Sequence, residues 1–117
     1  MLAPEERGVS GARESSILHD IRLALGLVDG LVLWRNNSGV AMQADRPVRY
    51  GLGLGGADLV GCYRGHFVAL EVKRPGGQPT AEQVAWLEVV RRNGGVAEVV
   101  HSVEEAMSVV EGMGDQA

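Results

Sequence analysis

The stretch DLVGCYRGHFVALEVK, residues 58–73, decides the fold. Its two halves have the β-branched and aromatic content of strands, and Arg64-Gly65 between them predicts a tight turn. We therefore predict an antiparallel hairpin with strands at 58–63 and 66–73. Because side chains alternate along a strand, one face of the second strand should carry Val68, Leu70 and Val72, and the other Phe67, Ala69, Glu71 and Lys73.

Two carboxylates are expected to face each other across this hairpin. A turn centred on Arg64-Gly65 pairs residues whose numbers sum to about 129, and Asp58 and Glu71 meet this condition. Two partly buried carboxylates so close together repel each other unless a cation lies between them. A hard divalent ion such as Mg²⁺ takes oxygen ligands and leaves positions open for water and phosphate. The pair therefore predicts a metal site suited to phosphoryl chemistry.

Three further residues could complete such a site. Lys73, the only lysine beside ten arginines, shares a strand face with Glu71 and could neutralise charge at a reacting phosphate. Glu14 could complete the metal shell from the inward face of the first predicted helix, and Gln83 could position water or phosphate. Each residue also has an ordinary structural explanation. Asp58 could simply start a strand, Glu71 and Lys73 could form a surface ion pair, Glu14 could be an ordinary helix residue, and Gln83 could serve only as the capping partner of Thr80.

The flanking sequence predicts a mixed α/β fold. The strand–helix–strand at the end needs a crossover connection, so its two strands should be parallel, whereas the central hairpin is antiparallel. The expected order is α-β-β-β-α-β-α, with a hairpin arm inserted after the first strand. The elements outside the central hairpin are a helix at 11–25, a strand at 31–35, an arm within 36–56 that turns at Ala44-Asp45-Arg46-Pro47, a helix from the Thr80 cap to Arg92, a strand at 96–100, and a helix from a Ser102–Glu105 capping box to about 111.

Length and composition fit one domain spanning 1–117, with ends at 1–10 and 113–117 that we expect to be flexible. The apolar content of 45% suffices for a core. No apolar run approaches the roughly 18 residues of a membrane span, and the first residues lack the apolar part of a signal peptide. The single cysteine, Cys62, excludes an internal disulfide. We expect a soluble, cytoplasmic protein with no membrane partner.

The net charge of −4 does not favour a nucleic-acid partner, but the charge is unevenly distributed. Four arginines fall within a stretch of about thirty residues that holds only two acidic residues. If exposed together, they could bind phosphates; otherwise they are solvated loop charges. The four are Arg35, Arg46, Arg49 and Arg64.

The segment Gly56-Ala57-Asp58-Leu59-Val60-Gly61, followed by Glu71-Val72-Lys73 and then Gln83 and Trp86, resembles the VRR-NUC domain of the PD-(D/E)xK nuclease superfamily. The resemblance also includes Glu14 and Arg35-Asn36-Asn37-Ser38-Gly39, and it covers about 14–111. Ala57 stands where the superfamily motif has proline. The resemblance implies a restriction endonuclease-like core and a DNA endonuclease that depends on Mg²⁺ or Mn²⁺.

The same resemblance implies roles for individual residues. It assigns the metal ligands to the carboxylates of Glu14, Asp58 and Glu71 and to the Val72 carbonyl, and it assigns catalytic roles to Asp58, Glu71, Lys73 and Gln83. Candidate DNA-binding residues are Arg35, Asn37, Arg46 and Arg49. Small stand-alone members are typical of phages and prophages, and are associated with homodimers and with cleavage of branched DNA such as four-way (Holliday) junctions.

Two other functions stay open at this stage. The chain could be a catalytically silent nuclease-fold module that binds DNA or a protein, or a nuclease that acts on ordinary duplex in restriction or repair. A homodimer would place two sites against the two-fold symmetry of a junction. Candidate interface residues are Trp34, Tyr50 and Trp86, although core burial is the stronger explanation for Trp86.

Overall fold

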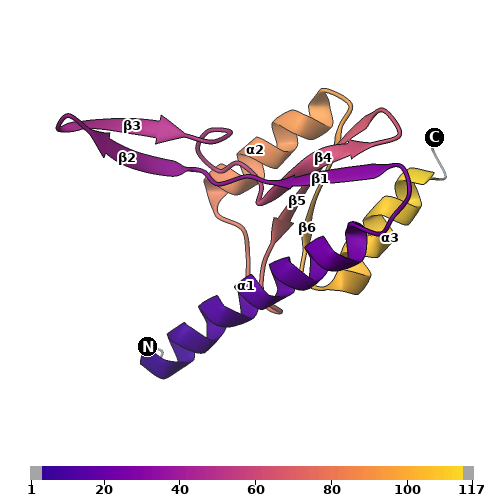
Figure 1. Cartoon of the computed structure of the whole chain (residues 1–117), viewed down its shortest axis with the longest axis horizontal. Coiled ribbons are helices and arrows are strands. Elements are labelled where there is room, and N and C mark those ends of the chain that lie inside the picture. The colour runs from indigo at the N-terminus through magenta and orange to yellow at the C-terminus, as the bar shows by residue number, and fades with distance from the viewer. Residues whose placement is uncertain (1–3, 115–117) are drawn as a thin grey trace.

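The structure, a computed structural model, describes residues 4–114, with side chains from Arg13 onward. It has an α/β fold in which three helices flank a mixed four-stranded sheet (Figure 1). The sheet order is β1-β4-β5-β6, and β2 and β3 form a separate two-stranded sheet. The elements are α1 (Pro4–Leu25), β1 (Leu31–Arg35), β2 (Gly39–Gln43), β3 (Arg46–Tyr50), β4 (Leu59–Tyr63), β5 (His66–Val72), α2 (Ala81–Arg92), β6 (Val96–Val100) and α3 (Val103–Gly114).

The central hairpin has the predicted register. Strands β4 and β5 are antiparallel and pair from Leu59 opposite Leu70 to Tyr63 opposite His66. The turn between them places Arg64 and Gly65 at positive φ, which matches the right-handed twist of the flanking strands. Strand β1 adds antiparallel to β4, and β6 adds parallel to β5. The mixed sheet and the parallel crossover through α2 are therefore confirmed.

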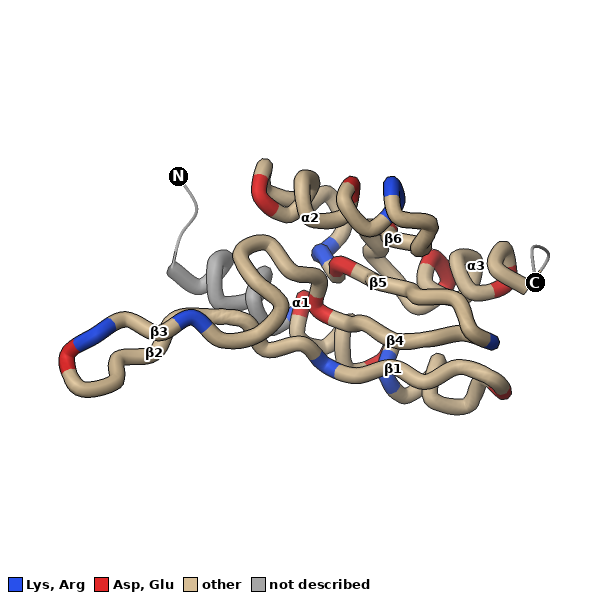
Figure 2. Tube along the Cα trace, turned by 90° about the horizontal axis from the view of Figure 1, so that it is seen from above, with Lys and Arg blue, Asp and Glu red and all other residues tan. Residues whose placement is uncertain are grey.

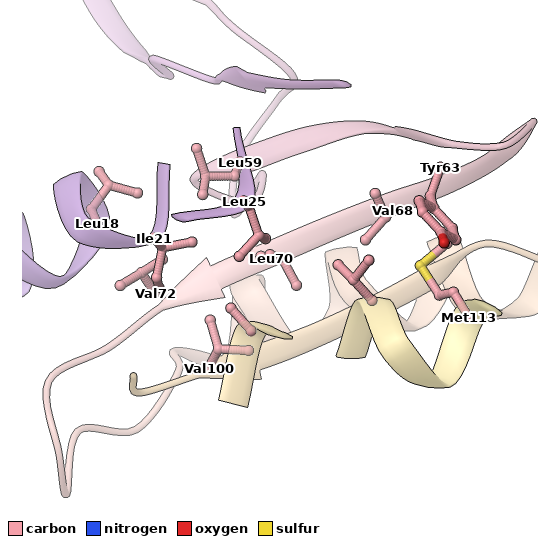
Figure 3. Packing of buried hydrophobic residues seen from close by; sticks show 12 residues of the cluster. Leu18, Ile21, Leu25, Leu59, Tyr63, Val68, Leu70, Val72, Val100 and Met113 are labelled. Carbon is pink, nitrogen blue, oxygen red and sulfur yellow. The ribbon is translucent and has the colours of Figure 1, made fainter. Parts of the chain in front are cut away.

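The two faces of the sheet carry different cores. One face of β5 packs Val68, Leu70 and Val72 against α1 and α3, where Ile21 and Leu25 are fully buried (Figure 3). The opposite face packs the small side chains of β5 and β6 against Leu87 of α2. Small residues let the helix approach this face closely, so α2 lies directly above the end of β5 that carries Glu71.

Helix α2 begins where the sequence predicted. Thr80 caps the helix through its hydroxyl, which accepts from the Gln83 backbone N–H at 3.2 Å. The Gln83 side chain accepts from the Thr80 backbone N–H at 2.8 Å, which completes the capping box. This exchange fixes the first turn of α2, and with it the Gln83 side chain.

The ends of the chain differ from the prediction. Helix α1 begins at Pro4 rather than near residue 11, and α3 continues to Gly114, with Met113 buried in the larger core. Residues 4–10 and 113–114, which we expected to be flexible, therefore belong to helices. The same expectation for 1–3 and 115–117 lies outside the described residues. None of the helices in the described part of the chain is both long and apolar enough to span a bilayer.

The predicted second capping box forms only in part. The Ser102 hydroxyl accepts from the Glu105 backbone N–H at 3.1 Å, as expected of a cap. The Glu105 carboxylate instead contacts His101. Its Oε1 atom accepts from the His101 backbone N–H at 3.3 Å and lies 3.0 Å from the ring Nδ1. This carboxylate raises the pKa of His101 by hydrogen bonding to the charged ring.

The arm is a hairpin with a tighter turn than predicted. Gln43 pairs with Arg46, so the turn contains only Ala44 and Asp45, both at positive φ. This is the two-residue hairpin geometry that usually selects Asn-Gly. Because Ala-Asp lacks this signature, the turn was predicted at the right place but as the longer segment 44–47.

Prediction for the core. Leu70, on β5, is fully buried in the larger core, to which α1 and α3 also contribute. Leu70→Ala should lower the free energy of unfolding by about 2–5 kcal/mol, because it removes buried methyl groups and leaves a cavity. Urea denaturation followed by circular dichroism measures the change. Leu27→Ala, at a side chain that is 89% exposed, is the control and should shift stability by about 0.5 kcal/mol or less.

Candidate functional site

Asp58 and Glu71 meet at the end of the central hairpin. Asp58 immediately precedes β4, and the β4–β5 register carried one residue further places it opposite Glu71. The Asp58 Oδ2 atom accepts from the backbone N–H of Val72 at 2.8 Å, which holds its carboxylate beside β5. The predicted cross-strand neighbours are thus brought together.

Glu71 is the buried charged side chain among the described residues, with only 3% of its surface exposed. Its Oε1 atom accepts from Nε2 of Gln83 at 3.0 Å and lies 3.9 Å from Nζ of Lys73. Its Oε2 atom is buried without a hydrogen-bond partner. A buried carboxylate oxygen left unpaired costs free energy, so this atom is set up either to hold a proton or to meet a cation.

The surroundings of Glu71 favour its neutral form. Its pKa is raised from 4.5 to about 8, chiefly because burial penalises the charged form and next because the Asp58 carboxylate lies close by. The Lys73 ammonium acts in the opposite direction, and Glu14 adds a smaller repulsion. The raised pKa therefore favours a proton on Glu71 at neutral pH when no cation is bound.

Gln83 forms the predicted cap and also makes a contact with Glu71 that the sequence did not predict. Its Oε1 atom accepts from Thr80 in the capping box, and its Nε2 atom donates to Glu71. The amide has one acceptor and two donors, so the two roles do not compete. The start of α2 thereby sets the orientation of the Glu71 carboxyl group.

Lys73 lies just beyond β5, where its backbone N–H donates to the Val100 carbonyl at 3.0 Å. Its side chain is 15% exposed, and that of Glu71 is 4% exposed. The alternative of a surface ion pair is therefore wrong, because both partners are largely removed from water.

A cleft of about 350 Å³ opens next to this pair. Asp58, Glu71 and Gln83 line one part of it, and the loop 53–56 lines another. Three of the four candidate DNA-binding residues also line it, namely Arg35, Asn37 and Arg49. The fourth, Arg46, lies on β3 next to the turn of the arm and outside the cleft lining. The cleft therefore joins acidic and basic groups at one end of the sheet.

The structure does not group Glu14 with the two carboxylates as a third ligand. Glu14 is half-buried on α1, and its charge reaches Glu71. The described residues contain no cluster of three or more His, Cys, Asp and Glu side chains that could hold a metal ion. Val72 lies beside the pair, but its side chain belongs to the larger core, so only its backbone can serve the site.

Asn36 is a residue of the site whose contacts the sequence did not predict. Its Nδ2 atom donates to Ser38 Oγ at 2.9 Å and to the Ala57 carbonyl at 3.0 Å, and its Oδ1 atom accepts from the Leu52 backbone N–H at 3.2 Å. Its own backbone N–H donates to the Asp58 carbonyl at 2.8 Å. The side chain thus ties the end of β1 to the glycine-rich loop and to the backbone of Asp58. Its place in an Asn-Asn-Ser-Gly run was the available signal.

The glycine-rich loop closes against the start of α2. A side chain at Gly55 would lie 2.3 Å from the Glu82 carbonyl oxygen, and φ at this glycine is +82°. Trp86 is half-buried against the smaller core, as expected, and its Nε1 atom donates to the Leu52 carbonyl at 3.0 Å. Asn36 and Trp86 therefore both hold the loop at Leu52, Asn36 through its backbone N–H and Trp86 through its carbonyl.

No protein-family model matches the chain, and no curated protein sequence matches it significantly. The assignment of function therefore rests on the chemistry of the site.

Prediction for the pH dependence of stability. The folded-state pKa of Glu71, about 8, lies above its ordinary value of 4.5, so the folded state retains a proton that the unfolded state loses. Its contribution to stability is complete below about pH 4.5 and is lost as the pH rises through about 8. In EDTA, the free energy of unfolding should fall by a few kcal/mol between about pH 4.5 and pH 8 because of Glu71. Glu71→Gln should remove this Glu71 contribution from the pH profile.

His101 provides the control for this measurement. Its raised pKa also gives stability that is lost with rising pH, so only the difference between wild type and Glu71→Gln reports on Glu71. His101→Gln should leave that difference unchanged. Parallel pH profiles for wild type and Glu71→Gln would contradict the buried-proton interpretation.

Proposed function

We propose that the protein is a metal-dependent DNA endonuclease of the VRR-NUC type. The observation that carries this proposal is the buried Glu71 carboxyl group with one unpartnered oxygen, opposite Asp58 and beside a cleft that arginines also line. A carboxylate pair with this burial is unfavourable alone and becomes favourable when a divalent cation shares its oxygens.

The donor set fits Mg²⁺ or Mn²⁺. Asp58 and Glu71 supply hard oxygen atoms, and Oε2 of Glu71 has no competing hydrogen bond. The Val72 carbonyl would be a further ligand, and Glu14 could act through an intervening water rather than as a direct ligand. When bound, such an ion polarises a phosphoryl oxygen and lowers the pKa of a coordinated water.

The other side chains have distinct tasks in this proposal. Lys73 provides a positive charge near Glu71 that can stabilise negative charge developing on the reacting phosphate. Gln83 holds Oε1 of Glu71, which leaves Oε2 as the free ligand atom. Arg35 and Arg49, on the cleft lining, would bind the phosphates that flank the cleaved bond.

We further propose branched DNA, such as a four-way junction, as the substrate, following the family resemblance. Helices α2 and α3 pack along the sheet, and neither projects from it as a recognition helix (Figure 1). Contacts to phosphates specify shape rather than base sequence. This favours a structure-selective nuclease over a sequence-specific one.

A homodimer is part of the same proposal. Helix α2 covers part of its sheet face, where the smaller core includes Val60 of β4. Elsewhere on that face, Val32 of β1 pairs with Cys62 of β4 and Cys62 with Phe67 of β5, next to Trp34, which is 58% exposed. Exposed apolar groups of this kind support an isologous contact with a second copy.

Prediction for catalysis. Wild type should cleave a labelled four-way junction in Mg²⁺ or Mn²⁺ and lose this activity in EDTA. Asp58→Asn and Glu71→Gln should abolish cleavage, and Lys73→Met should reduce the rate by about 100-fold or more while DNA affinity stays within a few-fold. Denaturing gels measure cleavage, with flap, single-stranded and duplex DNA as comparison substrates.

The control variant is Glu88→Gln, which removes an exposed carboxylate from α2 and should leave the rate unchanged. Mg²⁺ should also raise the melting temperature of wild type but not of Asp58→Asn or Glu71→Gln, because an ion that binds only the folded state stabilises it. Full activity in EDTA would refute the metal-dependent mechanism. DNA binding without cleavage of any substrate would favour a catalytically silent module.

Prediction for assembly. Sedimentation at micromolar concentration should give twice the mass of one chain for wild type. Trp34→Ser should give a monomer, because it removes the largest exposed apolar side chain of the uncovered part of that face. Leu27→Ser, which removes a still more exposed apolar group elsewhere, should leave the dimer intact. A monomeric wild type would exclude this interface.

A further inference from the structure

The arm formed by β2 and β3 is exposed on both faces. It projects from the body of the molecule, and its strands pair only with each other (Figure 1). Every residue of the two strands except Gly39 is exposed. An isolated two-stranded hairpin is marginally stable in water, so an arm rich in apolar side chains is best suited to binding a partner.

The register of the arm creates one apolar unit near its turn. Gln43 and Arg46 close the two-residue turn and form the hydrogen-bonded pair, so the next pair, Met42 and Pro47, is the non-hydrogen-bonded one. Side chains are closer together in such pairs. Met42, which is 68% exposed, and Pro47 therefore form a compact apolar tip on one face of the arm.

The outer edge of the arm is unsuited to pairing with another strand. In a non-hydrogen-bonded pair the backbone N–H groups point away from the partner strand, and Pro47 has no N–H to offer there. A proline at this position interrupts the row of donors that strand addition requires. The partner of the arm is therefore not an added β-strand on the β3 edge.

The charges of the arm favour a polyanion. Arg46 and Arg49 lie on opposite faces of β3, and Asp45 is the acidic residue of the arm. Figure 2 shows the basic positions of β3 spaced along the arm. Arg49 also lines the cleft that holds Asp58 and Glu71, so the basic residues continue from the cleft onto the arm.

We propose that this arm is a β-ribbon that enters a groove of DNA at a branch point and places the Met42–Pro47 tip against an unstacked base. The inference rests on the proposed function for the choice of branched DNA. A five-residue strand spans about 17 Å, which exceeds the groove depth of about 8 Å. Arg46 and Arg49, on opposite faces, would contact phosphates of the two groove walls, and apolar wedges of this kind unstack base steps.

The test uses the full chain and a four-way junction with 2-aminopurine at the branch point, in EDTA so that binding is measured without cleavage. Wild type should raise the fluorescence of 2-aminopurine as the base unstacks. Met42→Ser should abolish this rise and weaken junction binding by about tenfold, while affinity for plain duplex stays within about twofold. Val48→Ser, an exposed position on the opposite face of the same arm, should behave as wild type.

The outcomes separate the two proposals. Unchanged fluorescence and junction affinity in Met42→Ser, with a wild type that cleaves in Mg²⁺, would overturn the wedge alone. Halving of the solution mass by Met42→Ser would also overturn it, because the arm would then cover a second copy. A wild type that binds and unstacks the junction but never cleaves would overturn the nuclease alone, and absence of junction binding would overturn both.

Discussion

The burial of the Glu71 carboxyl group opposite Asp58 is the constraint on which the arrangement of the site depends. A charged group in this position costs free energy, and the surrounding elements provide partners for one of its two oxygens. The start of α2 supplies Gln83, the residue after β5 supplies Lys73, and the hairpin register supplies Asp58. One oxygen of Glu71 remains unpaired, and only a proton or a cation can compensate for it. The site therefore reduces the stability of the fold at neutral pH, and the cation of the proposed function would remove this cost.

The parts of the fold that the sequence predicted are those governed by local rules. The hairpin register follows from a two-residue turn and the alternation of side chains, and α2 follows from a capping box with two reciprocal hydrogen bonds. These rules also placed Asp58 opposite Glu71 and Gln83 in the first turn of α2, whereas the contact between Gln83 and Glu71 was not predicted. They operate over a few residues, so one sequence is sufficient to apply them.

The parts that the sequence missed depend on tertiary contacts. Helix α1 begins at Pro4, ahead of the apolar residues whose spacing predicted a helix from residue 11. Helix α3 continues to Gly114, because Met113 packs in the larger core. The contacts of Asn36 join residues 16 and 21 positions away, which no local pattern encodes. Glu14 was placed on the inward face by helical spacing, but spacing does not give the distance to a strand on another element. That distance decides between a ligand and a charge that only influences the site.

The order of strands also explains how an acidic chain could bind a polyanion. Strand β1, with Arg35 at its end, forms one edge of the sheet, and the arm with Arg46 and Arg49 follows it directly. Strand β6 forms the other edge, where β6 and the adjoining helix α3 carry Glu98, Glu104, Glu105 and Glu111. Because interactions between exposed charges are screened over about 10 Å at 0.1 M salt, a bound phosphate would respond mainly to the basic edge. The net charge of −4 therefore describes the chain as a whole and not the surface around the cleft. Under the proposed function, the acidic edge would repel DNA from the far side, and the same charge asymmetry would orient the duplex toward Asp58 and Glu71.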